Sequence, residues 1–176
     1  MKKRYLYVAV VAALLNFSSC SNSFLDLNPD TNITANTFYK TAEHFDQALV
    51  ASYTALRSIA QTGVMMDEMR SDNSFYTFYS GDRGPYASTE VLALFLDSGD
   101  PISWIETRYR DNYTCIGRVN TILNRLESSE MTDSEKNAVK AEALFLRAYY
   151  YYDLVQHWGG VPLILEEVQN EADAFK

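Results

Sequence analysis

The stretch AYYYYDLVQHWGGVP, residues 148–162, places four consecutive tyrosines before a Trp-Gly-Gly-Val-Pro ending. A helix turns by about 100° per residue, so the rings of residues 149–152 point in most directions around its axis. A helix on the surface of a domain buries only one stripe of side chains. The four tyrosines therefore predict a helix that other parts of the protein contact on several sides.

Upstream of the tyrosines, a T-x-x-E capping box at residues 132–135 predicts the start of this helix. The pattern continues to His157, and Gly159 and Gly160 are expected to end it. A second helix is expected from about 102 to 126, with Asp100 placed to cap it.

An earlier helix is expected from about 42 to 61. Apolar residues recur there at spacings of three and four, Thr41 is a candidate N-cap, and Gly63 is a plausible stop. Residues 161–168 are expected to form at most a short extended piece, and no region is rich in strand signals. The fold class predicted from the residues is therefore all-α, built from antiparallel helical pairs.

Between the first two helices, residues 65–89 form a long segment dense in aromatic rings, carboxylates and glycines. Loops of this length in a compact domain are commonly functional. Rings can stack on the C–H face of a sugar, while planar polar groups hydrogen-bond its hydroxyls. The alternative is that the same rings cap the helical core. The candidate ligand-binding residues are Asp72, Asn73, Phe75, Tyr76, Tyr79, Asp82 and Arg83.

The amino terminus has the three parts of an export signal. Three basic residues are followed by an apolar run from Tyr5 to Leu15 and by small residues before Cys20. A bilayer span needs about 20 apolar residues, and this run is shorter. Residues 1–19 are therefore predicted to be a signal peptide rather than a helix of the fold.

Cys20 suggests that this signal belongs to a lipoprotein. NFSSC, residues 16–20, resembles a bacterial lipobox, although Phe17 and Ser19 replace its commonest residues. Lipidation is expected at the Cys20 sulfur, and the polar residues 20–36 then form a tether. The alternative is a plain secreted protein in which Cys20 has no special role.

Charge and cysteine content exclude several classes of function. Loss of three basic residues with the signal leaves 12 of 15 Lys and Arg against 23 Asp and Glu, a net charge of −11. Such an acidic product does not suit the phosphates of nucleic acid. Apart from Cys20 the chain has only Cys115, which is expected to be a small buried hydrophobic residue. No disulfide framework or metal-type cysteine spacing is present.

Motifs for catalysis are also absent from the sequence. His44 and His157 belong to no zinc-binding pair, and no nucleophile elbow or phosphate loop occurs. Asp67 and Glu68 are adjacent, whereas a glycosidase needs two carboxyl groups facing each other across the bond. The prediction is a protein without catalytic residues, metal or cofactor. A glycosidase using these two carboxylates is the enzymatic alternative.

The final helix carries a family resemblance. AEALFLRAYYYYDLVQHWGGVPL, residues 141–163, resembles the helix and G-G-V-P-L turn of the SusD/RagB family. EMRSDN, residues 68–73, and the second helix with Trp104, Tyr109, Ile116 and Asn120 are also similar to that family.

The resemblance implies a lipid-anchored protein of the outer membrane, exposed at the cell surface. Such proteins bind glycans or other oligomeric nutrients, including peptides, without cleaving them. They act as the lid of a SusC-like TonB-dependent transporter. The resemblance also implies a tetratricopeptide-like scaffold of helical pairs whose irregular insertions bind the ligand.

Members of that family are several times longer than this chain. Residues 37–176 are therefore expected to be the amino-terminal part of a SusD-like helical domain. Additional helices would then cover the tyrosines, and Arg147 would help to fix such an interface. The alternatives are a helical scaffold that binds only a protein partner, or a truncated copy without function.

Overall fold

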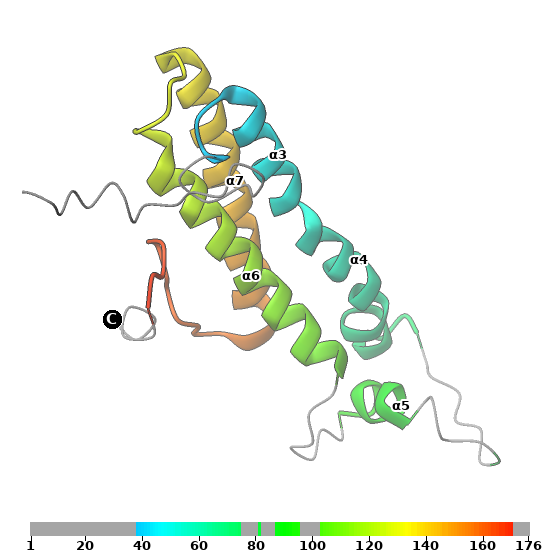
Figure 1. The fold of residues 1–176 in the computed structure, drawn as a ribbon. Coiled ribbons are helices and arrows are strands. Elements are labelled where there is room, and N and C mark those ends of the chain that lie inside the picture. The colour runs from blue at the N-terminus through cyan, green and yellow to red at the C-terminus, as the bar shows by residue number, and fades with distance from the viewer. Residues whose placement is uncertain (1–37, 75–80, 82–86, 96–102, 171–176) are drawn as a thin grey trace, which may run out of the picture. The chain divides into compact units, whose positions relative to one another are not determined.

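Helices make up the regular structure of residues 38–74, 81, 87–95 and 103–170, the part of the chain that the computed structural model describes (Figure 1). These residues belong to one unit, Phe38–Lys176, and every contact described below lies within it. The predicted all-α fold class is confirmed for the described residues. The predicted signal peptide, tether and Cys20 lie outside them.

The first predicted helix is present as two helices, α3 (Ala42–Ser52) and α4 (Thr54–Met66), which meet at Tyr53. The predicted cap is confirmed, because the Thr41 hydroxyl accepts a hydrogen bond from the backbone N–H of His44 at 3.4 Å. Gly63 as the helix stop is wrong, since it lies inside α4. A Cβ at this glycine would come within 3.3 Å of the Asp67 carboxylate, so its missing side chain makes room for that group.

The break at Tyr53 is stabilised by the following long helix, α6 (Ser103–Leu126). The Arg118 guanidinium donates to the Ala51 carbonyl at 2.8 Å and to the Thr54 hydroxyl at 2.7 Å. The Thr54 hydroxyl itself donates to the same carbonyl at 2.8 Å. A carbonyl released by the end of α3 is thereby satisfied by a side chain from another helix.

The predicted capping box begins α7 (Asp133–Trp158). The Glu135 carboxylate accepts from the Thr132 backbone N–H at 2.8 Å, and the Glu135 N–H donates to the Thr132 hydroxyl at 3.4 Å. The Thr132 hydroxyl also donates to the Glu135 carboxylate at 2.7 Å, and this bond and the one from the Thr132 backbone N–H lower the pKa of the Glu135 carboxyl. The helix ends at Gly159, whose φ of 70° lies in the left-handed region that favours glycine.

Loss of this cap gives a testable prediction. Thr132→Ala is expected to lower the free energy of unfolding by about 1 kcal/mol, because it removes the hydroxyl that satisfies an N-terminal donor of α7. Urea unfolding monitored by circular dichroism measures the change. Ser134→Ala, an exposed position in the same turn, is the control and should shift stability by less than about 0.5 kcal/mol. Equal effects of the two substitutions would contradict the capping role.

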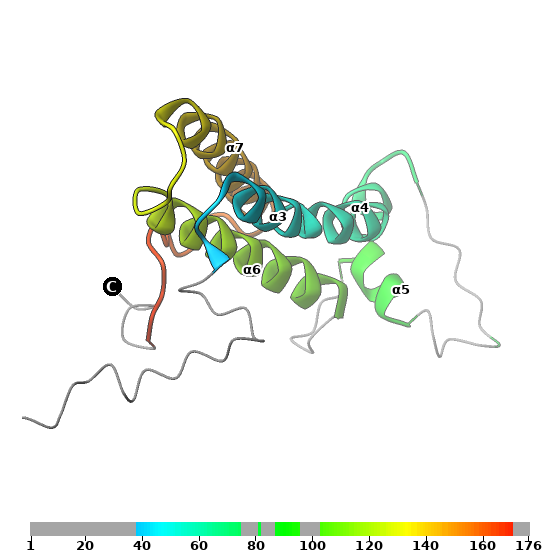
Figure 2. The same ribbon diagram turned by 45° about the horizontal axis from the view of Figure 1, so that its top comes forward.

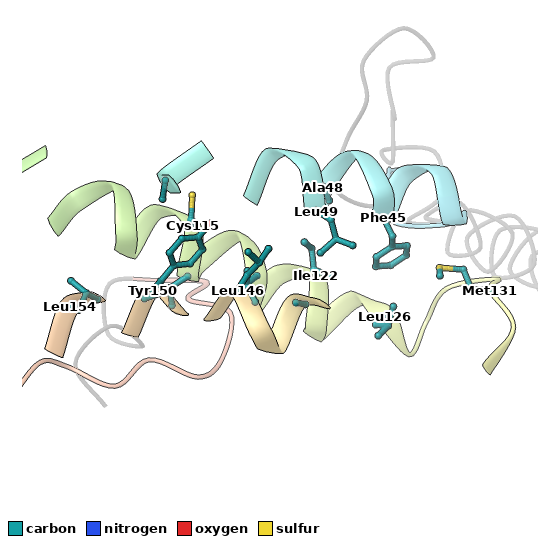
Figure 3. Packing of buried hydrophobic residues seen from close by; sticks show 14 residues of the cluster. Phe45, Ala48, Leu49, Cys115, Ile122, Leu126, Met131, Leu146, Tyr150 and Leu154 are labelled. Atoms are coloured by element: carbon teal, nitrogen blue, oxygen red, sulfur yellow. The ribbon is translucent and has the colours of Figure 1, made fainter. Parts of the chain in front are cut away.

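α6 contacts α3, α4 and α7, α3 also contacts α7, and α6 and α7 run antiparallel (Figures 1 and 2). Buried side chains therefore occur along α6 from Arg108 to Leu126. Cys115 is buried as predicted, with 1% of its surface exposed. Figure 3 shows the core between these helices, which includes Phe45, Leu49, Cys115, Ile122, Leu126, Leu146, Tyr150 and Leu154.

The segment predicted as a continuous loop, residues 65–89, contains helical structure at both ends. α4 extends to Met66, a 3₁₀ turn η2 (Glu68–Arg70) follows, and α5 (Ala87–Ala93) lies at the far end. Leu92 and Met66 are buried in a second hydrophobic cluster. The partly buried side chains packed on it are Met65, Val91, Trp104, Ile105 and Trp158.

Beyond Gly159 the chain folds back along α6 and α7 as an irregular strap, residues 159–170. No β-strand is formed in it. The absence of strand agrees with the weak extended signal in the sequence. The strap positions several of the polar contacts described next.

Candidate functional site

The four tyrosines of α7 have different surroundings. Tyr150 is fully buried and donates a hydrogen bond to the Ser52 carbonyl at the end of α3. Tyr151 is half-buried, whereas Tyr149 and Tyr152 have 39% and 62% of their surface exposed. The prediction of contacts on several sides is therefore confirmed for Tyr150 and Tyr151. It is wrong for Tyr149 and Tyr152, whose rings are exposed among the described residues.

Tyrosine hydroxyls of α6 and α7 bind the backbone of the strap. The Tyr151 hydroxyl accepts from the N–H of Ile164 at 2.7 Å and lies 2.9 Å from its carbonyl. Tyr113 donates to the Pro162 carbonyl at 2.7 Å. Burial raises the pKa of both tyrosines, so the hydroxyls remain protonated donors at neutral pH.

Asn120 and Arg147 complete the attachment of the strap. The Asn120 amide donates to the carbonyls of Ile164 and Glu166 at 2.9 and 3.1 Å. Arg147 donates to the Asn120 side-chain oxygen at 2.8 Å and to the Leu165 carbonyl at 2.9 Å. Arg147 thus links α7 both to α6 and to the strap, and the expected role of Arg147 at an interface with additional helices stays a prediction.

Glu167 joins the strap to the end of α6. Its carboxylate accepts from Asn124 at 2.6 Å and from Thr121 and Arg125 at 3.3 Å. Burial alone would raise the pKa of Glu167, but the hydrogen bonds from Asn124 and Arg125 outweigh it and lower the pKa below its ordinary value of 4.5. The ionised form is therefore more favourable in the folded chain than in the unfolded one.

The lowered pKa predicts a pH dependence. The stabilisation from Glu167 is present above pH 4.5 and is lost as the pH falls through the lower pKa of the folded state. Glu167→Gln should therefore destabilise the chain by about 1 kcal/mol at pH 7 and by less near pH 3, as measured by urea unfolding at each pH. The exposed neighbour Glu166 provides the control variant Glu166→Gln. A difference between Glu167→Gln and wild type that stays constant with pH would contradict the assignment.

A buried ion pair connects α6 and α7 at their other end. Arg108, with 2% of its surface exposed, donates from Nε and NH2 to both carboxylate oxygens of Asp153, at 3.1 and 2.5 Å. The Asn112 amide donates to the same carboxylate at 2.8 Å. Burial by itself would lower the pKa of Arg108, yet the contacts with Asp153 and Asp67 raise it. Arg108 is therefore charged at neutral pH, as arginine side chains in proteins are.

Asp67 and His157 extend this network to the start of the segment after α4. Arg108 NH1 donates to Asp67 at 3.2 Å. The Nε2 of His157 lies 2.6 Å from Asp67 Oδ1, while its Nδ1 lies 2.7 Å from the Asp153 carbonyl. Both ring nitrogens face acceptors, so a protonated imidazole can donate on both sides. No sequence pattern indicated these contacts of His157, because helix packing brings their partners together.

The network bears on the enzymatic alternative. Asp67 is engaged by Arg108 and His157, and it starts the turn rather than facing a second carboxylate across an open site. Residues 38–74, 87–95 and 103–170 contain no group of three or more His, Cys, Asp or Glu that could hold a metal ion. In this part of the chain the network links the end of α4 to α6 and α7.

Two predicted ligand-binding residues follow η2 directly. Asp72 and Asn73 are exposed in a turn in which the Ser71 hydroxyl donates to the Glu68 carbonyl at 2.8 Å and accepts from the Asn73 N–H at 3.2 Å. Asp72 and Asn73 are thus exposed, and their role in ligand binding stays a prediction. The other candidates lie outside the described residues: Phe75, Tyr76, Tyr79, Asp82 and Arg83.

Phe95 is a candidate that the sequence reading missed. It follows α5, has 63% of its surface exposed, and its ring centroid lies 4.3 Å from the Arg70 guanidinium carbon. Arg70 and Phe95 flank the segment that contains the predicted ligand-binding residues. No sequence signal distinguished this ring from an ordinary core phenylalanine, because its exposure depends on where α5 ends.

A surface hollow of about 280 Å³ lies between α3 and the first half of α7. Its floor is apolar, and Asp46, Glu135 and Glu142 contribute carboxylates. The Tyr53 hydroxyl donates to Glu142 at 2.7 Å. The hollow involves the first half of α7, whereas Asp153 and His157 of the ion-pair network lie in the last two turns of that helix. No helix in the described ranges is both long and apolar enough for a bilayer crossing.

Comparison with known proteins identifies relatives over most of the chain. Residues 23–174 match the family model SusD-like_3, described as "Starch-binding associating with outer membrane". A SusD-like protein of Formosa agariphila is 29% identical over 170 residues, which cover 95% of this chain and 32% of that protein. A SusD-like protein of Bacteroides ovatus is 27% identical over 177 residues, covering 98% of this chain and 30% of the relative.

The chain thus spans about a third of the length of these relatives. No solved structure matches it. The family match covers the helices, the ion-pair network and the exposed turn after η2. The chain belongs to the SusD-like family of starch-binding proteins that associate with the outer membrane.

Proposed function

We propose that this protein binds a glycan or another oligomeric nutrient without cleaving it, and delivers it to a SusC-like TonB-dependent transporter. The observation that carries the proposal is the family match over residues 23–174. The exposed residues Asp72 and Asn73 support it, because they lie beside η2, which Asp67 joins to the buried Arg108–Asp153 pair. A ligand can then bind to the turn while the helices remain rigid.

A glycan array probed with the purified chain, followed by affinity electrophoresis in soluble starch, tests the binding role. Retardation in the starch gel that free maltoheptaose relieves is expected. Asp72→Ala and Asn73→Ala should weaken binding, because each removes an exposed hydrogen-bonding group beside η2. Cleavage of any oligosaccharide, detected by chromatography of the products, would contradict a non-enzymatic role. Absence of glycan binding together with peptide binding would make the nutrient a peptide and leave delivery in place.

Membrane attachment is proposed to occur through lipid on Cys20, after removal of residues 1–19 and with residues 20–36 as tether. Several acyl chains hold a protein firmly at a membrane, whereas one chain alone is marginal. Mass spectrometry of the amino-terminal peptide should show acylated Cys20, and Cys20→Ser should release the protein from membranes. Protease treatment of intact cells then tests exposure at the cell surface. An unmodified Cys20 in membrane-bound protein would contradict the anchor.

A second candidate role, a helical scaffold that binds a protein partner, is favoured by the exposed face of α7. Phe145, Tyr149 and Tyr152 lie on one face at helical spacing, with 65%, 39% and 62% of their surfaces exposed. Large exposed apolar patches favour contact with another protein segment.

We propose that residues 37–176 form the amino-terminal part of a longer helical domain, in which further helices contact this face.

Purification from outer membranes distinguishes the two roles. A nutrient-delivery protein should copurify with a barrel transporter and bind an oligomer, whereas a pure scaffold should copurify without any ligand response. Changing Phe145 and Tyr152 together to Ser should reduce self-association of the isolated chain if this face is uncovered. A monomeric chain that unfolds cooperatively, with no change from these substitutions, would contradict the incomplete-domain proposal.

A further inference from the structure

The charges of the ion-pair network balance only when His157 is protonated. Arg108 supplies one positive charge, whereas Asp67 and Asp153 supply two negative ones. The His157 ring lies beside both carboxylates, with Nε2 2.6 Å from Asp67 Oδ1 and Nδ1 3.7 Å from Asp153 Oδ1. These charged groups come from the end of α4, from α6 and from α7, the elements that meet at the ring. Because Arg108 and Asp153 are buried, where unpaired charge is costly, an imidazolium here completes a neutral network.

The hydrogen-bond partners of the ring favour the same protonation state. Nδ1 lies 2.7 Å from the Asp153 backbone carbonyl, and Nε2 lies 2.6 Å from the Asp67 carboxylate. A neutral imidazole has one N–H donor and one lone pair, so one of its nitrogens would face an acceptor with no hydrogen between them. Asp67 acts as an acceptor here, because NH1 of Arg108 donates to both of its oxygens at 3.4 and 3.2 Å. A protonated imidazole satisfies both sides.

Loss of the proton would open the contact with Asp67 rather than the contact with the Asp153 carbonyl. That carbonyl belongs to the same helix, four residues before His157, and it stays close to the ring as long as α7 is formed. The Asp67 side chain follows a different helix and has 44% of its surface exposed, so water can replace His157 as its partner. Arg108 would then remain as the link from Asp67 to α6.

Asp67 is the residue at which the chain passes from α4 into η2. The turn after η2 is closed by a hydrogen bond from the Ser71 N–H to the Glu68 carbonyl at 3.1 Å. Asp72 and Asn73 follow directly and are exposed. The contact between His157 and Asp67 therefore lies at the base of the turn that carries these two residues.

We propose that the His157–Asp67 contact is controlled by a proton: the protonated imidazole holds η2 and the turn after it, and the neutral imidazole releases them. Histidine is the side chain whose charge ordinarily changes between about pH 5 and 8. The added stabilisation is present at the acid end of this range and is lost as the pH rises, because protonation favours the closed contact. A consequence that rests on the proposed function is a higher affinity for the nutrient at pH 6 than at pH 8.

Hydrogen exchange of the amides in residues 67–74 tests the contact without a ligand. After correction for the intrinsic pH dependence of exchange, protection in the wild type should fall about fivefold from pH 6 to pH 8, because a charge-assisted hydrogen bond is lost. Both pH values lie above the ordinary titration range of carboxyl groups. Glutamine keeps a donor but carries no charge, so His157→Gln should give equal protection at both. The other histidine provides the matched control, since His44→Gln should retain the wild-type pH dependence.

Nuclear magnetic resonance of isotope-labelled histidine gives a readout that needs no substitution at the contact. At pH 6 both ring nitrogens of His157 should carry hydrogen, as the two facing acceptors require. The spectrum of His44→Gln assigns the signals, because His157 is then the only histidine left in the sequence. A neutral His157 ring at pH 6, with hydrogen on one nitrogen alone, would overturn the proposal.

The outcomes separate the proton-controlled contact from the nutrient-binding role. Protection of residues 67–74 that is constant with pH in the wild type, or that changes equally in His157→Gln, would overturn the contact and leave nutrient binding intact. Protection that depends on pH in the wild type and not in His157→Gln establishes the contact, even in a chain that binds no glycan on the array. In a chain that binds, equal affinities at the two pH values would overturn the effect on binding.

Discussion

Asp153→Asn is expected to lower the free energy of unfolding by about 3 kcal/mol. The substitution keeps the shape of the side chain but removes the charge that pairs with Arg108 through two hydrogen bonds. Arg108 has 2% of its surface exposed, and an uncompensated buried charge costs about 3–5 kcal/mol. The lower end of that range applies because Asp67 still contacts the guanidinium at 3.2 Å. Urea unfolding at neutral pH measures the change.

Asp111→Asn is the matched control for this substitution. Asp111 pairs with Arg110 at 3.8 Å on the exposed side of the same helix, and such surface pairs contribute at most about 1 kcal/mol. In addition, Arg108→Met combined with Asp153→Asn should cost less than the sum of the two single changes, since the partners are coupled. Similar effects of Asp153→Asn and Asp111→Asn would show that the buried pair does not stabilise the fold.

Tyr150→Ala should lower the free energy of unfolding by about 3–4 kcal/mol, as other large truncations in a core do. Tyr150 is fully buried among α3, α6 and α7, where it packs with Cys115 and Leu146 in the core (Figure 3). The substitution leaves a cavity and also frees the Ser52 carbonyl. Tyr150→Phe removes only the hydroxyl and should cost about 1 kcal/mol. Denaturant unfolding of the two variants beside the wild type measures both changes.

Tyr152→Ala tests the same chemistry on the exposed face. With 62% of its surface exposed, Tyr152 should contribute less than about 0.5 kcal/mol in the isolated chain. The loss of stability differs strongly from that of Tyr150→Ala because residues two apart on a helix point in nearly opposite directions, so Tyr150 is buried and Tyr152 is exposed. If Tyr152→Ala were as destabilising as Tyr150→Ala, the exposure of this face would be wrong.

The sequence predicted the helical elements where local chemistry determines them. The capping box of α7, the Thr41 cap and Gly159 are signals contained within a few residues, and each was confirmed. The break at Tyr53 could not be found in this way, because it depends on Arg118 of another helix. Gly63 misled for a similar reason, since the space it provides is used by the Asp67 carboxylate.

The candidate site was less predictable than the fold. Aromatic density drew attention to the segment after α4, where Asp72 and Asn73 are exposed, and the binding role of this segment stays a prediction. Phe95 was missed because exposure of a ring follows from tertiary structure rather than from residue type. The network of Arg108 and His157 was missed because its members are brought together from residues 67, 108, 153 and 157 by helix packing.

The attachment of the strap has a consequence for how freely its sequence can change over evolution. The strap is held through its backbone carbonyls, which every amino acid has. The side chains that donate to carbonyls of residues 162–166 are Tyr113, Asn120, Arg147 and Tyr151. Leu163 and Leu165 point outward, with 69% and 50% of their surfaces exposed. Substitutions at these two positions should therefore be tolerated without detaching the segment, so that homologues can diversify this ridge while the four anchoring side chains are retained.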